Sequence, residues 1–276
     1  MNPLTPLTLW RECLDLSTQA LLIVCALMTF LWLIQLMTRN AAIVDAGWAI
    51  GIAICAALYA FNGSGAFPRR WLLAIMVGIW AARLGLHLLF NRIVGHPEEG
   101  RYVELRRKWA SHVNLKFFAF YQAQALSCVI LSTPFLLACL NPASELNLVE
   151  KAAAALWVIA TSGVTIADMQ LNRFKNDSSN AGKVCREGLW SWSRHPNYFF
   201  EWLIWLSYGL YALPAPYGFV GMIAPALMLH FMLNVTGIPP TEAQALRSRG
   251  DEYRRYQQEV SEFIPLPPKA GNAGAV

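Results

Sequence analysis

The sequence predicts an all-α protein that crosses a lipid bilayer several times. Of its 276 residues, 56% are hydrophobic and only 14% are charged, whereas a soluble domain carries about 25% charged residues. The hydrophobic residues form blocks of about 20, the length at which an α-helix spans the hydrocarbon core. Most charged residues stand between these blocks. These observations indicate a polytopic helical membrane protein.

Seven hydrophobic blocks each predict one transmembrane helix. They cover residues 19–37, 41–61, 71–91, 116–140, 149–167, 197–213 and 217–236. The first follows a polar N-terminus and has no small-residue cleavage site after it, so we expect a span rather than a signal peptide. The sixth is short and bounded by Pro196 and Pro214, which suggests a tilted or partly re-entrant segment. We expect a single seven-helix domain over residues 1–269, a cytoplasmic C-terminal helix within it, and a disordered tail over 270–276.

The basic residues predict how the chain is oriented. With seven spans, 17 of the 22 Lys and Arg residues fall in the first, third and fifth connectors and the C-terminal segment. Basic residues resist translocation, so the side that holds them is cytoplasmic. We therefore expect the N-terminus outside and the C-terminus inside, in a bacterial inner membrane. The net charge of +5 follows from this topology and does not indicate nucleic-acid binding.

The six cysteines are scattered, without any CxxC motif. This spacing predicts free thiols that act as small apolar residues, and neither a disulfide framework nor a zinc site. We expect no metal, and a monomer with the bilayer as its surroundings.

Five polar residues fall within the hydrophobic blocks: Asp45, Arg83, His87, Glu201 and His230. Such residues are costly in a membrane and usually face a cavity or a partner. Arg83 and His87 are four residues apart and therefore share one helix face. A buried ion pair such as Asp45–Arg83 is the structural alternative to a functional site. For His230 we expect a buried, hydrogen-bonded histidine.

Residues 168–205 contain the densest set of candidate ligand-binding side chains. Arg173, Lys175, Lys183 and Arg194 suit phosphate groups. Neighbouring aromatic side chains suit stacking: Trp190, Trp192 and Tyr198. Asn197 and Glu201 lie four residues apart at a helix start, where they can hold a polar ring or amide. The alternative is a basic loop against anionic headgroups with an interfacial aromatic belt.

The C-terminal segment 241–268 is also polar. Glu242 precedes Arg247 and Arg249, which suggests a charged helix beside the cytoplasmic loops. Tyr253 and Tyr256 share one face of this helix. A simple amphipathic surface helix is the alternative.

Several motifs follow one another in a fixed order in the second half. They are Phe174-Lys175, Asn180-x-Gly182-Lys183, Gly188-Leu189-Trp190, Arg194-His195-Pro196-Asn197-Tyr198-Phe199-x-Glu201-Trp202, Tyr253-x-x-Tyr256 and Phe263-Ile264-Pro265-x-Pro267-Pro268. Their combination resembles the bacterial membrane branch of the steroid 5α-reductase family over about residues 168–269, and more weakly over the first half. The Arg-His-Pro-x-Tyr element alone is also similar to membrane isoprenylcysteine and phospholipid methyltransferases.

The resemblance implies a seven-helix reductase that uses NADPH to saturate the 4,5 double bond of a 3-oxo-4-ene steroid or a similar lipid enone. It implies that the cofactor lies among the cytoplasmic loops. Lys175 stands where the family has an arginine, and Arg101, in Gly100-Arg101, would reach the adenine end. The implied cofactor-binding residues are Arg101, Asp168, Arg173, Lys175, Lys183, Arg194, His195, Asn197, Tyr198, Glu201, Arg249 and Tyr256.

Animal members of that family use a glutamate on the second span and a tyrosine on the third to polarise the ketone. In this chain the second span offers Asp45 and the third offers His87. A protonated His87, or an Asp45 held neutral by burial, could donate to the ketone oxygen as charge develops on it. Apolar candidates for the lining of the substrate site are Trp48, Phe120, Tyr121 and Trp202, and core packing is the alternative for each of them.

Two other functions stay open from the sequence. One is a membrane methyltransferase that uses S-adenosylmethionine, and the other is a non-catalytic sterol-binding protein. The phosphate-suited residues Arg101, Arg173, Lys175 and Lys183 favour NADPH, since S-adenosylmethionine carries no phosphate. The chain has no GxGxxG motif after a strand, so a Rossmann domain is not supported.

Overall fold

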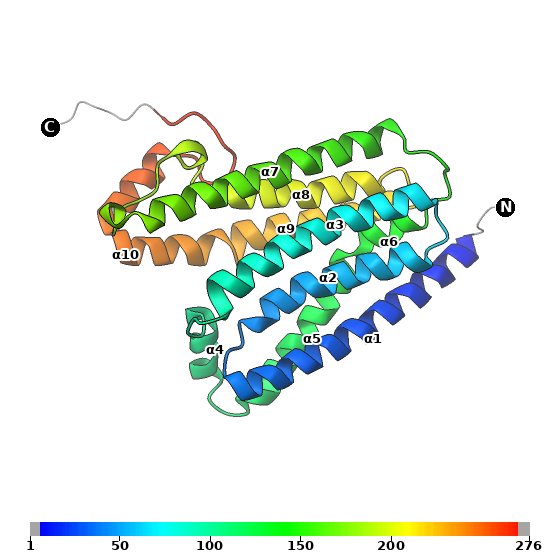
Figure 1. Ribbon diagram of the computed structural model, residues 1–276, viewed down its shortest axis with the longest axis horizontal. Helices are drawn as coiled ribbons and strands as arrows, with labels where there is room; N and C mark the ends of the chain where they lie inside the picture. Colours follow the sequence, from blue (N-terminus) through cyan, green and yellow to red (C-terminus); the bar gives the residue numbers. More distant parts are fainter. Residues whose placement is uncertain (1–5, 270–276) are drawn as a thin grey trace. The chain divides into compact units, whose positions relative to one another are not determined.

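The computed structural model describes residues 6–269, and its regular secondary structure is helical (Figure 1). The predicted all-α class is therefore confirmed, whereas the predicted tail over 270–276 lies outside the described residues. An isolated parallel bridge joins Ser193 and Ser261. In chain order the helices are α1 (Pro6–Thr38), α2 (Ile43–Asn62), α3 (Phe67–Leu88), η1 (Leu89–Ile93), α4 (Gly100–Trp109), α5 (Val113–Leu131), α6 (Thr133–Cys139), α7 (Leu148–Asn176), η2 (Ser178–Asn180), η3 (Gly188–Ser191), α8 (Pro196–Ala212), η4 (Gly218–Met222), α9 (Ile223–Asn234) and α10 (Ile238–Glu259).

Within residues 6–269, six helical stretches are long and apolar enough to cross a membrane. They are Pro6–Thr38, Ile43–Asn62, Phe67–Ile93, Val113–Cys139, Leu148–Asn176 and Gly218–Glu259. The sixth predicted block does form a helix, α8, but it has only 17 residues. At 1.5 Å per residue that is about 25 Å, less than the ~30 Å of a bilayer core. By length and hydrophobicity, residues 6–269 therefore contain six candidate spans, one fewer than the seven predicted.

The chain divides into two compact units, which we describe separately. Unit 1 comprises Met1–Glu150 and Tyr211–Ala224, and unit 2 comprises Lys151–Leu210 and Pro225–Val276. Each unit is built around its own set of packed helices, so each has its own core and its own buried polar groups.

In unit 1, α2 packs against α1, α3 and α5 (Figure 1). Two glycines on α2 make the close approach possible. A Cβ on Gly47 would overlap the side chain of Leu31 on α1, and one on Gly51 would lie 3.0 Å from Cys128 Sγ on α5. Their spacing of four residues puts both on one helix face, as in the small-residue interfaces of membrane helices.

A buried ion pair joins the start of α3 to the start of α7. The side chains of Arg69 and Glu150 are 1% and 0% exposed and form an ion pair. The remaining guanidinium donors of Arg69 reach backbone carbonyls of the connecting loop: Asn141 at 3.3 Å, Glu145 at 2.6 Å, and Ala143. One arginine therefore satisfies the carbonyl groups of a loop that has no regular structure of its own.

In unit 2, α7 and α8 lie side by side (Figure 1). A Cβ on Gly163 would overlap the ring of Phe200, so only glycine permits this approach. Further along the pair, Trp157 Nε1 donates to Tyr208 Oη at 3.0 Å. Trp202 Nε1 on α8 donates to the carbonyl of Pro225 on α9 at 3.1 Å.

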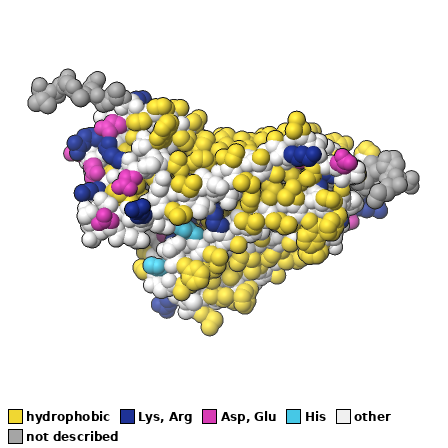
Figure 2. Space-filling view, turned by 45° about the horizontal axis from the view of Figure 1, so that its top comes forward, with side chains coloured by type: hydrophobic (Ala, Val, Ile, Leu, Met, Phe, Trp, Pro, Cys, Tyr) yellow, Lys and Arg dark blue, Asp and Glu magenta, His cyan; other side chains and the backbone are white. Residues whose placement is uncertain are grey.

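Large hydrophobic side chains also cover the outside of the helices. On α1 they include Leu14 (67% exposed), Leu22 (66%), Phe30 (60%) and Met37 (86%). Figure 2 shows hydrophobic side chains over much of the visible face, and charged ones gathered near the C-terminal segment. A water-soluble protein rarely exposes so much apolar surface. The six apolar helices and this surface identify an integral membrane protein.

Glu150→Gln should destabilise unit 1 strongly, because it leaves the Arg69 guanidinium buried without a counter-ion. We expect the free energy of unfolding to fall by about 3–5 kcal/mol, measured by chemical denaturation in detergent micelles. Glu104→Gln is the control, since it removes the same charge from an exposed pair with Arg107 and should cost less than about 1 kcal/mol. Equal losses in the two variants would contradict a stabilising role for the buried pair.

Candidate functional site

In unit 1, a cluster of ionisable side chains lies where α4 meets the first turn of α2. Tyr102 Oη donates to Asp45 Oδ1 at 2.7 Å. Arg101 forms an ion pair with the other oxygen of the same carboxylate. The side chain of Asp45 is 18% exposed and that of Arg101 is 46% exposed. A carboxylate, a phenol and a guanidinium therefore meet at a partly open position.

Tyr102 is fixed from several sides. It is 1% exposed, its ring stacks edge-on against Phe120 at 6.3 Å, and Arg101 lies over its face at 4.7 Å. Burial raises the pKa of the Tyr102 phenol, and the Asp45 carboxylate raises it further. The hydroxyl therefore stays protonated and remains a hydrogen-bond donor well above neutral pH.

Sequence reasoning missed Tyr102. The signal that could have found it is an aromatic residue directly after Gly100-Arg101, in a connector that is otherwise charged. The sequence-predicted residues Asp45 and Arg101 are brought together here. The proposed structural alternative, an Asp45–Arg83 pair, is replaced by Asp45–Arg101.

His87 lies near the end of α3 and is half-buried. Its ring Nδ1 is 3.1 Å from Asn91 Nδ2 on η1. The segment η1 is a π-helix, a distortion that is found often at functional sites. Arg83 is also half-buried, one turn before His87.

Two predicted substrate-lining residues form hydrogen bonds within unit 1, where Trp48 is half-buried and Tyr121 is part of the core. Trp48 Nε1 donates to Ser127 Oγ at 3.0 Å, and its ring packs against Trp80 at 6.0 Å. Tyr121 is fully buried and donates to the carbonyl of Ala41 at 3.0 Å. Both side chains therefore hold helices together, and substrate contact stays a prediction for them.

In unit 2, hydrogen-bond donors converge on the carboxylate of Glu242. Arg194 Nε lies at 2.7 Å and His195 Nε2 at 3.2 Å from Oε1. Tyr253 Oη donates to Oε1 at 3.2 Å, and Gln257 Nε2 donates to Oε2 at 2.6 Å. The Arg194 and Glu242 side chains are only 9% and 12% exposed. So many donors around one carboxylate favour its ionised form.

The same arginine fixes the chain that follows α10. Arg194 Nη1 donates to the carbonyls of Val260 at 2.7 Å and Gln257 at 3.1 Å, and its backbone N–H donates to Ser261 at 2.8 Å. Tyr256 Oη donates to the carbonyl of Ser193 at 3.3 Å. Together with Glu242, these contacts form a clamp between residues 190–195 and α10. We call it the Glu242 clamp.

The Glu242 clamp contains three residues for which the resemblance implies cofactor contact: Arg194, His195 and Tyr256. All three are buried, and their polar atoms point at protein groups. Tyr198 extends the clamp, since its ring stacks on His195 at 5.4 Å and its hydroxyl lies 3.1 Å from Thr241 Oγ1. For these residues direct cofactor contact stays a prediction.

Glu242 itself does not pair with the arginines expected from the sequence. Arg247 instead donates to Gln244, and Arg249 Nε donates to the carbonyl of Lys183 at 2.9 Å. Its true partners Tyr253 and Gln257 lie beyond Gly250, where the backbone of α10 is non-helical (φ 53°, ψ −124°) and the chain turns back toward Glu242.

A second polar group of unit 2 lies where α7 faces the start of α8. Asn197 Nδ2 is 3.5 Å from Asp168 Oδ1, and Glu201 follows one turn later, half-buried. The predicted residue Asp168 therefore lies on α7, and the predicted residues Asn197 and Glu201 lie on the adjacent helix α8. The rings of Trp202 and Phe263 pack together with their centroids 6.0 Å apart.

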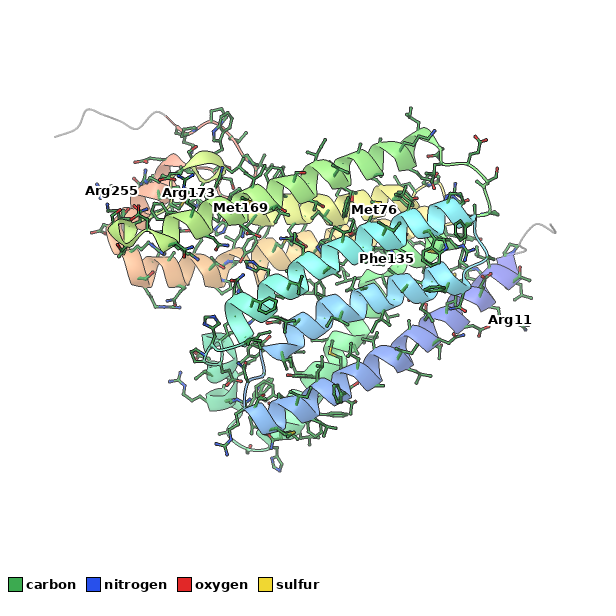
Figure 3. All side chains as sticks on the ribbon, viewed as in Figure 1. Arg11, Met76, Phe135, Met169, Arg173 and Arg255 are labelled. Atoms are coloured by element: carbon green, nitrogen blue, oxygen red, sulfur yellow. The ribbon has the colours of Figure 1, made fainter. Side chains whose placement is uncertain are left out.

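Exposed basic side chains gather at one end of unit 2. Arg173, Lys175 and Lys183 are all exposed. Figure 3 shows Arg173 and Arg255 at the same end, where α7 finishes and α10 folds back. His230, expected to be buried, is instead exposed, 3.4 Å from Asn234 Nδ2.

Glu242→Gln should loosen the Glu242 clamp, because it leaves Arg194 buried beside a neutral group. We expect a loss of about 3 kcal/mol in unfolding free energy and faster proteolysis of residues 177–195. Glu259→Gln is the matched control, since it breaks an exposed pair with Arg186. A clamp without structural importance would leave both variants equally stable and equally resistant.

Comparisons with known proteins identify a family for this chain. A model of the family described as "Protein of unknown function (DUF1295)" matches residues 31–260. The chain is 27% identical over 271 residues to the uncharacterized protein C594.04c of Schizosaccharomyces pombe, covering 85% of this chain and 75% of that protein. No solved structure matches. The chain belongs to the DUF1295 family, which includes steroid 5α-reductase-like proteins.

Proposed function

We propose that this protein is a membrane reductase that uses NADPH to saturate the carbon–carbon double bond of a lipid enone, such as a 3-oxo-4-ene steroid. The observation that carries the proposal is the hydrogen bond from Tyr102 to Asp45 beside Arg101. An enone gains negative charge on its ketone oxygen when hydride adds to the β-carbon. A positioned donor at that oxygen lowers the barrier.

Unit 1 supplies such a donor. The Tyr102 hydroxyl stays protonated and can turn from Asp45 to a ketone oxygen by rotation about its C–O bond. Arg101 holds the Asp45 carboxylate in place, and the carboxylate orients the phenol. His87 is a second candidate donor, half-buried beside the π-helix η1. The resulting enolate takes a proton from water at its α-carbon, and this step completes the saturation.

Unit 2 supplies groups that fit a nicotinamide dinucleotide. The exposed cations Arg173, Lys175 and Lys183 suit its phosphates. The amide of Asn197 and the carboxylate of Asp168 suit polar ring substituents. When bound, NADPH would supply the hydride. S-adenosylmethionine has no phosphate for these cations, which is why we favour reduction over methyl transfer.

We also infer the topology that brings this chemistry to the right compartment. With α8 as a short seventh span, 17 of 22 basic residues fall on one side, and that side is cytoplasmic by the positive-inside rule. The C-terminus and the basic end of unit 2 then face the cytosol of a bacterium, where NADPH is available. An apolar enone would enter from the bilayer.

The proposal predicts consumption of NADPH by the purified protein in lipid nanodiscs when 4-en-3-one steroids are added. Tyr102→Phe and Asp45→Asn should each lower kcat about 100-fold, the effect of losing one transition-state hydrogen bond. His87→Ala should also lower turnover. NADPH binding should change less than about twofold.

Tyr59→Phe is the control for Tyr102→Phe, because it removes a buried hydroxyl of the same unit that lies 3.3 Å from Ser132 Oγ. It should leave kcat unchanged within about twofold. If the wild-type protein reduces none of the 4-en-3-one steroids, the proposed function fails. If Tyr102→Phe and Tyr59→Phe change kcat equally, the assignment of Tyr102 as the donor fails.

A further inference from the structure

Unit 1 contains a cavity of about 520 Å³ where α1 ends and α5 begins. It is lined by Gln35, Leu36, Arg39, Glu98, Arg106, Val113 and Asn114. None of these residues belongs to the Asp45 group or to the residues that we propose for the cofactor.

One of the residues that line the cavity, Gln35, carries a buried donor that has no acceptor among residues 6–269. Gln35 is 1% exposed, and its Oε1 accepts a hydrogen bond from Arg106 Nη2 at 2.9 Å. A guanidinium can only donate, so this contact fixes which end of the amide is oxygen. Gln35 Nε2 is then a buried donor without a hydrogen-bond partner among residues 6–269. A buried donor of this kind favours a ligand that brings an acceptor.

The lining also carries one uncompensated positive charge. Both carboxylate oxygens of Glu98 accept hydrogen bonds. Arg106 Nε donates to Oε2 at 2.8 Å, and the Ala41 N–H donates to Oε1 at 2.7 Å. The charges of Glu98 and Arg106 therefore cancel. Arg39 is exposed and forms no ion pair with any described residue. An anion is the ligand that this balance favours.

The position of the cavity points to the source of that anion. Gln35 and Leu36 lie in the last turns of the membrane-crossing helix α1, and Val113 and Asn114 lie in the first turn of α5. The ends of membrane helices lie at the level of the lipid headgroups. Trp32, whose indole donates to the Asn114 carbonyl at 3.0 Å, suits the same interfacial level.

We propose that this cavity binds the phosphate of an anionic glycerophospholipid. The phosphate accepts from Gln35 Nε2 and pairs with Arg39, while Leu36 and Val113 contact the apolar part of the lipid next to the headgroup. The site is independent of the proposed reductase activity, and it fixes α1, α4 and α5 to one lipid molecule.

Native mass spectrometry of the purified protein tests this site. Dioleoylphosphatidylglycerol, dioleoylphosphatidylcholine and inorganic phosphate are added separately to delipidated protein. We expect bound phosphatidylglycerol in excess of phosphatidylcholine. Arg39→Gln should lower its affinity about fivefold, the effect of one basic residue near an anionic headgroup. Gln35→Glu, which keeps an acceptor for Arg106 but removes the donor, should lower it as well.

Arg107→Gln is the matched control, because it removes the same charge from α4 at a side chain that is 82% exposed and outside the cavity. Its affinity for phosphatidylglycerol should change less than about twofold. Equal losses in Arg39→Gln and Arg107→Gln, or equal binding of both lipids, would overturn the proposal. Binding of inorganic phosphate with the same Arg39 dependence and without lipid preference would identify a soluble anion instead, and would also overturn it.

Discussion

A charged side chain that is buried in the protein needs partners within the protein, and this constraint accounts for the main long-range contacts inside each unit. In unit 1 it places Glu150 against Arg69, whose other donors reach the loop carbonyls. In unit 2 it places Glu242 among Arg194, His195 and two neutral donors. Each cluster joins segments far apart in the sequence, so the helices can pack only in arrangements that complete it.

The Asp45–Arg101 pair of the candidate site differs from these two buried clusters in the solvent exposure of its side chains. The Arg69–Glu150 and Arg194–Glu242 side chains are 12% exposed or less, and their polar atoms are turned toward protein groups. The Asp45–Arg101 pair is open, with Arg101 46% exposed, while the phenol beside it is buried and stays protonated. A site that must receive a ligand needs this combination of a fixed donor and an accessible edge.

The sequence predicted what depends on local pattern. Six of the seven hydrophobic blocks overlap helical stretches long enough to cross a membrane, and Asp45, Arg101, Asp168 and Asn197 lie in polar groups. Contacts between residues far apart in the sequence leave no local pattern from which they could be predicted. Neither the Glu242–Arg194 contact, 48 residues apart, nor the partner of Asp45, 56 residues away, could be derived from spacing. Tyr121 was predicted as a candidate for the substrate lining with core packing as the alternative, and its side chain is fully buried in the core.

The central claim of the proposed function is that the exposed basic residues and the Asp168–Asn197 group of unit 2 bind a nicotinamide dinucleotide rather than a methyl donor. Parallel calorimetric titration of the purified protein with NADPH, NADH and S-adenosylmethionine tests it most directly. Reductase chemistry predicts that NADPH binds, that Arg173→Gln weakens its binding, and that S-adenosylmethionine does not bind. Binding of S-adenosylmethionine without NADPH would contradict the account in favour of methyl transfer, and binding of no cofactor would contradict it in favour of a lipid-binding protein.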